Sequence, residues 1–148
     1  MTAPLNVSAI ERSLMTMRTS LDQLESIGPV DVARLTGDCA VGVVVERVLA
    51  LLAELACVIN RRISATVLGE VPVTSAGSFA SAARAGAIEG RLALTLAPPE
   101  GPHHVLVQLV LDAEPEAVAP VVSEALSGYR AYAHQVADWV ANGPKLDR

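Results

Sequence analysis

The residues best suited to chemistry gather in one short stretch, Gly101 to Asp112, which holds two of the chain's three histidines. His103 and His104 stand side by side near its start, and Gln108 follows four residues after His104. An imidazole exchanges protons near neutral pH and also binds metal ions, so such a pair is suited to acid–base catalysis or to metal binding. Pro102 fits the first turn of a helix, and on that helix His104 and Gln108 share one face.

The rest of the chain is composed to form helices that position this stretch. Of its 148 residues, 51% are hydrophobic and only 3% are aromatic, so the core must be built from aliphatic side chains. A chain rich in Ala and Leu, with little alternation of polar and apolar residues, favours helices over strands. We predict one domain over residues 1–148 with a loose tail at 143–148. Its fold is an all-α, up-and-down bundle of about five to six helices, two of them long.

Apolar spacing and helix-ending residues place these helices. They are predicted at residues 7–26, 39–68, 75–85, 88–97 and 115–141, with a short helical turn at 29–35. The longest helix, 39–68, should lie centrally and be covered on more than one side. Val44 is predicted to face inward along it, and Leu51 and Val58 to widen its apolar face. Pro115 is predicted at the first position of the final helix.

Charge and cysteine usage restrict the function further. The formal net charge is −5, which argues against strong nonspecific binding to nucleic-acid backbones but leaves room for a small basic groove. Cys39 and Cys57 fall on one predicted helix, about 27 Å apart at 1.5 Å per residue, too far for a disulfide. We interpret them as two reduced, buried thiols. With no uncharged apolar run long enough to span a membrane and no signal-peptide pattern, a cytoplasmic protein is expected.

The stretch from Gly101 to Asp112 resembles the signature helix of the HepT-like ribonuclease toxins of the HEPN superfamily. The glycine, the apolar residues and the acidic residue of that pattern are matched by Gly101, Val105, Leu106, Val107 and Asp112. The catalytic positions differ. His103 stands where the family has Arg and His104 where it has Asn. Gln108 stands where the family has its catalytic His, and Val110 where it often has Tyr.

The resemblance extends over most of the chain, from about Ile10 to Val140. The long helix carries Val45-Glu46-Arg47-Val48 near its start and Asn60 toward its end, and a small helix ending in Ala85-Gly86 follows. Tyr129-Arg130-Ala131-Tyr132 lies in the last helix. The resemblance implies an all-helical homodimer whose two signature helices meet near a twofold axis and form a composite site for RNA. It also implies a nucleotidyltransferase-type antitoxin as partner and requires no cofactor or metal ion.

The changed positions alter the chemistry that the resemblance implies. Gln108 cannot titrate, and His103 is charged only part of the time, so neither replaces the acid–base His or the phosphate-binding Arg. Weak or absent ribonuclease activity is therefore expected, and whether the chain is an enzyme stays open. Either His103 and His104 supply a displaced acid–base or metal site across the twofold axis, or they are polar groups lining a degenerate cleft. A non-catalytic, dimeric interaction protein and a small-ligand pocket between helices are the alternative functions.

Overall fold

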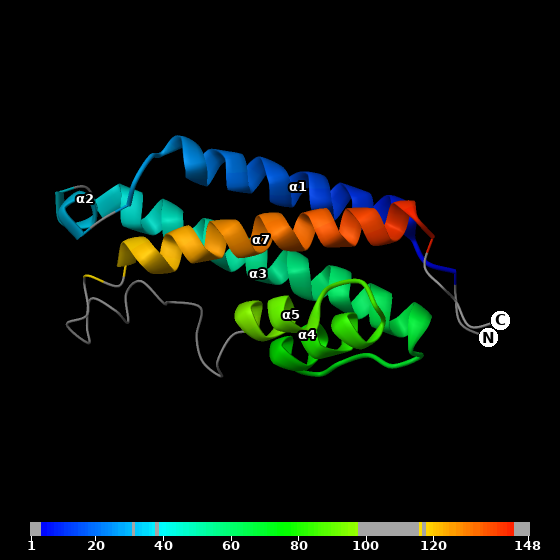
Figure 1. Ribbon diagram of the computed structural model, residues 1–148. Coiled ribbons are helices and arrows are strands. Elements are labelled where there is room, and N and C mark those ends of the chain that lie inside the picture. Colours follow the sequence, from blue (N-terminus) through cyan, green and yellow to red (C-terminus); the bar gives the residue numbers. More distant parts are fainter. Residues whose placement is uncertain (1–3, 31, 38, 98–115, 117, 144–148) are drawn as a thin grey trace.

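The computed structural model describes residues 4–30, 32–37, 39–97, 116 and 118–143, and within these ranges it contains helices and no strand (Figure 1). The predicted all-α helical bundle is therefore confirmed. Its helices are α1 (Val7–Ser26), α2 (Val32–Gly37), α3 (Cys39–Val67), α4 (Ser75–Arg84), α5 (Gly90–Leu96) and α7 (Val118–Ala141). With 20 residues, α1 is a third long helix beside α3 and α7.

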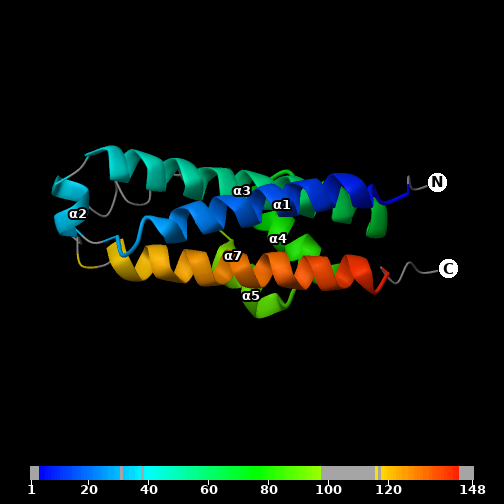
Figure 2. The same cartoon turned by 90° about the horizontal axis from the view of Figure 1, so that it is seen from above.

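Three long helices lie side by side and form the body of the bundle. Figures 1 and 2 show α1 running antiparallel to both α3 and α7, with α2 at the end where α3 begins. The helix α1 contacts both α3 and α7, whereas α4 packs on α3 and α5 packs on α4 and α7. The short helices α4 and α5 therefore lie along the half of the bundle where α3 and α7 end, whereas α2 lies at the opposite end (Figure 1).

Local sequence accounts for where the helices begin and end. The side chain of Asn6 accepts a hydrogen bond from the backbone N–H of Ala9 at 3.0 Å, which satisfies a free donor at the start of α1. Thr74 caps α4 in the same way through the N–H of Gly77, also at 3.0 Å. Gly69 follows α3 with a φ of +68°, a left-handed conformation that favours glycine.

The core is aliphatic, as the composition requires. It joins the buried faces of α1, α3, α4, α5 and α7 in one main cluster, with a smaller cluster at the α2 end. The largest fully buried side chains are Tyr132, Phe79, Ile10, Met17, Leu21, Leu24, Leu52, Ile59, Ile63, Val45 and Val136. Cys57 is buried and free, and both cysteines lie in α3, as predicted.

Two predictions about the long helices need correction. The residues Val44, Leu51 and Val58 are exposed, at 45%, 38% and 42%, although Val44 was predicted to face inward and all three to be covered. In the described part of the chain, α1 and α4 cover two sides of α3 and leave its outward side open. The helix α7 begins at Val118, three residues later than predicted, and Pro115 lies outside the described residues.

No helix among the described residues combines the length and the apolar character that crossing a bilayer requires.

Candidate functional site

The predicted catalytic positions His103, His104 and Gln108 lie in the segment 98–115, outside the described residues, as does Val110. The structure therefore places the two helices that flank this segment rather than the segment itself.

The flanking helices α5 and α7 are held together by a close contact. Gly128 lies in the middle of α7, and a Cβ atom added to it would come 2.8 Å from Cδ2 of Leu96, at the end of α5. A side chain at this position would require the Leu96 side chain to shift, and glycine lets α5 and α7 meet without that adjustment. The segment thus leaves α5 beside Gly128 and rejoins the helical structure at Val118, about 15 Å away along α7 at 1.5 Å per residue.

Inside the bundle, a chain of buried polar side chains connects three helices. The hydroxyl of Tyr132 on α7 donates to Oδ1 of Asn60 on α3 at 2.6 Å and lies 3.1 Å from the carbonyl oxygen of Ala56. The amide nitrogen of Asn60 donates to the hydroxyl oxygen of Ser78 on α4 at 3.2 Å. That hydroxyl in turn donates to the carbonyl of Ser75 at 2.7 Å. Each polar group has a partner, so this network fixes the positions of α3, α4 and α7.

Burial also determines the protonation of the two tyrosines. Desolvation raises the pKa of Tyr132 well above its ordinary value, with smaller contributions from the nearby Cys57 and Tyr129. Burial, followed by the effect of Cys57, raises the pKa of Tyr129 to about 12. Tyr132 also packs edge-on against Phe79, with ring centroids 6.0 Å apart. Tyr132 is fully buried and stays neutral at physiological pH, so it serves the fold and is not available to a substrate.

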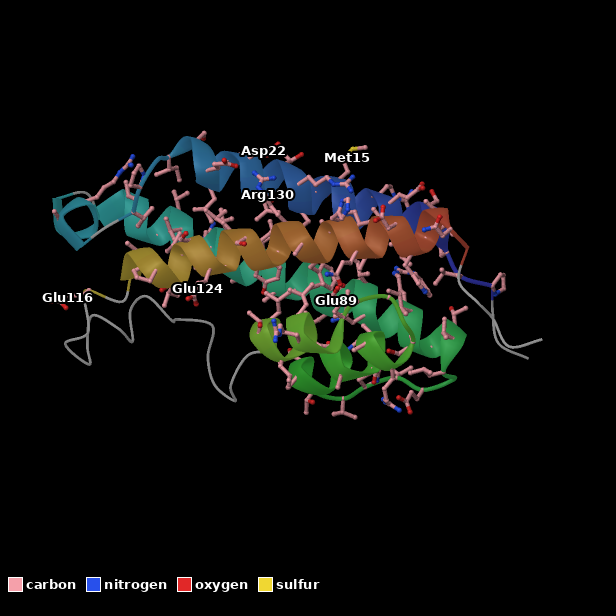
Figure 3. All side chains as sticks on the ribbon, viewed as in Figure 1. Met15, Asp22, Glu89, Glu116, Glu124 and Arg130 are labelled. Atoms are coloured by element: carbon pink, nitrogen blue, oxygen red, sulfur yellow. The ribbon has the colours of Figure 1, made fainter. Side chains whose placement is uncertain are left out.

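On the surface, an ion-pair cluster joins α1 to α7. The guanidinium of Arg130 lies 2.9 Å from Oδ1 of Asp22 and also pairs with Glu25, and Figure 3 shows Arg130 directed toward Asp22. Hydrogen bonds to these two carboxylates raise the pKa of Arg130. His134 is exposed, as predicted, with Nε2 3.3 Å from Oδ2 of Asp138.

Two surface hollows lie against α7. The larger, with a volume of about 580 Å³, lies between the α4–α5 connection and the end of α7, and Glu89 and Trp139 are among its lining residues. The smaller, about 290 Å³, lies beside the ion-pair cluster of α1 and α7. Both are open to solvent, and the described side chains show no arrangement of nucleophile and base in either.

Several arginines that a basic groove would need are engaged in structural contacts. Arg130 is neutralised by its two carboxylates, and Arg84 pairs with Glu70. Arg61 donates to the carbonyl oxygens of Pro72 and Val73 at 3.3 and 3.4 Å, which ties down the connection between α3 and α4. Within the described ranges, no group of three His, Cys, Asp or Glu side chains is placed to hold a metal ion.

Comparison with known proteins adds no identification. No model of a protein family matches the chain, and no curated protein sequence matches it significantly.

The buried Asn60–Tyr132 pair was not anticipated from the sequence. The sequence places Asn60 in the long helix and Tyr132 in the final helix but does not indicate that the two side chains meet. A signal was present nonetheless: Asn60 follows a long apolar run, where an amide must find a hydrogen-bonding partner.

Proposed function

We propose that this chain is a HepT-like protein of the toxin–antitoxin type, related to metal-independent ribonucleases but with weak or no ribonuclease activity. The observation that carries the proposal is the order of the helices. The long α3 is followed by the small α4, the short α5 and the long α7. This is the order of the family that residues 101–112 resemble, and those residues fall between α5 and α7, where the signature helix is expected.

The expected loss of activity follows from the chemistry of RNA cleavage. In that reaction the ribose 2′-hydroxyl attacks the neighbouring phosphorus, while a general base accepts its proton and a cation stabilises the phosphate. Gln108 neither accepts nor donates a proton by ionising, and His103 is a weaker cation than Arg at neutral pH. In some members of the family the antitoxin modifies the signature Tyr with adenylate. Val110 stands at that position and has no hydroxyl group, so this modification cannot occur there.

A second candidate is a non-catalytic dimer that binds a nucleotidyltransferase-type antitoxin or another protein. The observation that favours it is the apolar surface on the outward side of α3, formed by Val44, Leu51 and Val58. These side chains give one side of α3 apolar surface for a protein partner to cover. The net charge of −5, together with the engagement of Arg61, Arg84 and Arg130 in structural contacts, also favours a protein partner over RNA.

The experiment that tests the proposal is cleavage of a mixed RNA substrate by the purified protein in EDTA. We expect little or no cleavage. Any slow cleavage should be lost in His103→Ala or His104→Ala and kept in His134→Ala, which removes an exposed histidine from a different part of the fold. Fast, EDTA-resistant cleavage that survives all three substitutions and co-elutes with the protein would contradict the proposal. Absence of cleavage, with specific capture of a nucleotidyltransferase, would favour the second candidate.

A further inference from the structure

The larger surface hollow, between the α4–α5 connection and the end of α7, has the size of a ligand site. Its volume of about 580 Å³ lies within the range of pockets that bind small molecules. One wall is a single side of α7, because its residues follow one another at spacings of three, one and three positions: Gln135, Asp138, Trp139 and Asn142. The opposite wall is formed by residues 85–89. The hollow therefore lies between two segments that are far apart in the sequence.

The connection that forms the second wall is fixed in place. The backbone N–H of Glu89 donates to Oε1 of Gln135 on α7 at 2.8 Å, which holds the two walls together. The N–H of Ala87 donates to the carbonyl oxygen of Ala82 in α4 at 3.1 Å. Ala87 and Ile88 are 2% and 5% exposed, so they anchor the connection in the core. A ligand therefore meets a preformed site, which lowers the cost of ordering side chains on binding.

The hollow is lined by carboxylates and by no cationic side chain. Glu89 and Asp138 are among its lining residues, and none of the described residues that line it is Lys, Arg or His. Glu89 occupies the N-cap position of α5, between α5 and α7 in Figure 3, yet its carboxylate makes no capping hydrogen bond. It also makes no ion pair with the described residues, whereas Oδ2 of Asp138 lies 3.3 Å from Nε2 of His134. The negative charge of Glu89 is therefore uncompensated within the described part of the chain.

The same hollow contains the most accessible aromatic ring of the chain. Besides its one Trp, the chain has one Phe and two Tyr, and all three of these, Phe79, Tyr129 and Tyr132, are buried. Trp139 is only partly buried: it packs against the main core cluster and also lines the hollow. The face of an indole ring attracts cations more strongly than that of any other aromatic side chain. An accessible indole beside an uncompensated carboxylate is a combination of groups suited to an organic ammonium ion.

We propose that this hollow binds a small organic cation, an ammonium group on a short alkyl chain. The ammonium is bound by the carboxylate of Glu89 and the indole of Trp139, and a second ammonium, as in an aliphatic diamine, is bound by Asp138. A metal ion fits less well, since no group of three His, Cys, Asp or Glu side chains in the described ranges is placed to hold one. The net charge of −5 also attracts cations to the protein. The proposal involves no residue of the stretch 101–112, and it stands whether or not the chain acts on RNA.

The first test is a titration of the full chain with butane-1,4-diamine near neutral pH. Fluorescence excited at 295 nm reports on Trp139, the only tryptophan, and we expect a saturable change. Isothermal titration calorimetry should give one binding site per chain. Binding should weaken several-fold in about 0.5 M salt, because salt screens the charge pairs. Two controls should not reproduce the change: butane-1,4-diol, which has the same chain length without charge, and magnesium chloride at the same ionic strength.

The second test places the binding at the hollow rather than elsewhere on an acidic surface. Glu89→Gln removes the charge and keeps the length of the side chain, and we expect it to weaken diamine binding about fivefold. The matched control is Glu124→Gln, which removes an exposed carboxylate of the same helix about 22 Å from Trp139 along α7 and should leave the affinity unchanged. Both variants should keep the helicity of the wild type, because neither carboxylate has a partner among the described residues.

A third variant tests the aromatic ring. Trp139→Leu keeps an apolar side chain against the core and removes the indole, and it should weaken binding about threefold to tenfold. Its affinity is measured by calorimetry, because the variant lacks the fluorophore.

Three results would overturn the proposal. One is the absence of both a fluorescence change and a heat of binding at about 10 mM diamine, tenfold above a millimolar dissociation constant. Another is equal binding by the wild type and Glu89→Gln, which would place the diamine elsewhere on the protein. The third is an equal fluorescence change with the diol or with magnesium ions, which would show that the ammonium group is not what the hollow recognises.

Discussion

The buried hydrogen bond between Tyr132 and Asn60 yields the sharpest prediction about stability. Tyr132→Phe removes the hydroxyl that donates to Oδ1 of Asn60 at 2.6 Å and leaves the ring in place against Phe79. Asn60 is fully buried, so its carbonyl oxygen then has no donor and no access to water. Leaving a buried acceptor unsatisfied costs about 1–3 kcal/mol. We expect a loss of about 2 kcal/mol in the free energy of unfolding.

The assay is urea unfolding followed by circular dichroism, with Tyr129→Phe as the matched control. Tyr129 lies on the same helix and is 7% exposed, but its hydroxyl makes no hydrogen bond to the described residues. Its removal should therefore change stability by no more than about 0.5 kcal/mol. The slope of unfolding free energy against urea should be the same for both variants and the wild type. For a chain of this size, the Tyr132→Phe loss corresponds to a melting temperature lower by about 4–8 °C.

A double-mutant cycle separates the bond from its surroundings. In an Asn60→Leu background, Tyr132→Phe removes only the weaker contact with the carbonyl of Ala56, so its cost should fall below about 1 kcal/mol. The reasoning is refuted by equal losses in Tyr129→Phe and Tyr132→Phe, or by a cost of Tyr132→Phe that is the same with and without Asn60.

Three further predictions concern the described helices. Both tyrosines have raised pKa values, so their absorbance at 295 nm should show no ionisation near pH 10 in the folded protein, whereas the urea-unfolded chain should titrate there. The unfolded state then loses protons that the folded state keeps. The free energy of unfolding is therefore unchanged by these groups below pH 10 and falls above it, by up to about 1.4 kcal/mol per pH unit for each tyrosine. For Tyr129 this fall ends at its pKa in the folded protein, about 12. In a Leu96→Ala background, where the contact with Leu96 is gone, Gly128→Ala should raise the free energy of unfolding by up to about 1 kcal/mol. In the wild type, where the new methyl group meets Leu96, the same substitution should raise it less or lower it. An equal change in unfolding free energy in both backgrounds would contradict the contact. Arg130→Met should cost no more than about 1 kcal/mol, and less in 1 M salt, because its ion pairs are exposed; an effect independent of salt would show that packing dominates.

The helical framework was predictable because local signals and tertiary packing agree. The helix α1 has the predicted bounds, since its apolar stripe, its cap at Asn6 and the Gly28–Pro29 break all mark the same segment. The helix α3 ends one residue before its predicted end, just ahead of Gly69. In such segments the periodicity of apolar residues and the helix-ending residues together determine where the helix begins and ends.

The outward side of α3 could not be predicted because periodicity alone does not say which apolar residues are covered. Val44 and Val45 are neighbours with the same side chain, yet Val45 is fully buried and Val44 is 45% exposed. Which of two wide apolar faces meets α1 depends on how the helices are arranged, and that is set by long-range packing. The same limit applies to Tyr132, because only the position of α3 beside α7 reveals that its hydroxyl has a partner.

The candidate site rests on the sequence, since His103, His104 and Gln108 lie outside the described residues. What the structure adds is the frame: α5 held on α7 by Leu96 and Gly128, before a segment that rejoins α7 at Val118. The identity of the catalytic positions depends on the resemblance alone. The periodicity of apolar residues reveals which side of a helix is buried, but not which polar residues take part in a reaction.

The most direct test of the proposed function restores the family's residues in one protein: His103→Arg, His104→Asn and Gln108→His. If residues 101–112 retain the frame of a ribonuclease site and only its chemistry has changed, the triple variant should cleave RNA in EDTA. The wild type and the variants with a single change should leave the RNA largely intact. A triple variant that folds with the same helicity and association state as the wild type, and yet has no more activity than it, would contradict the account.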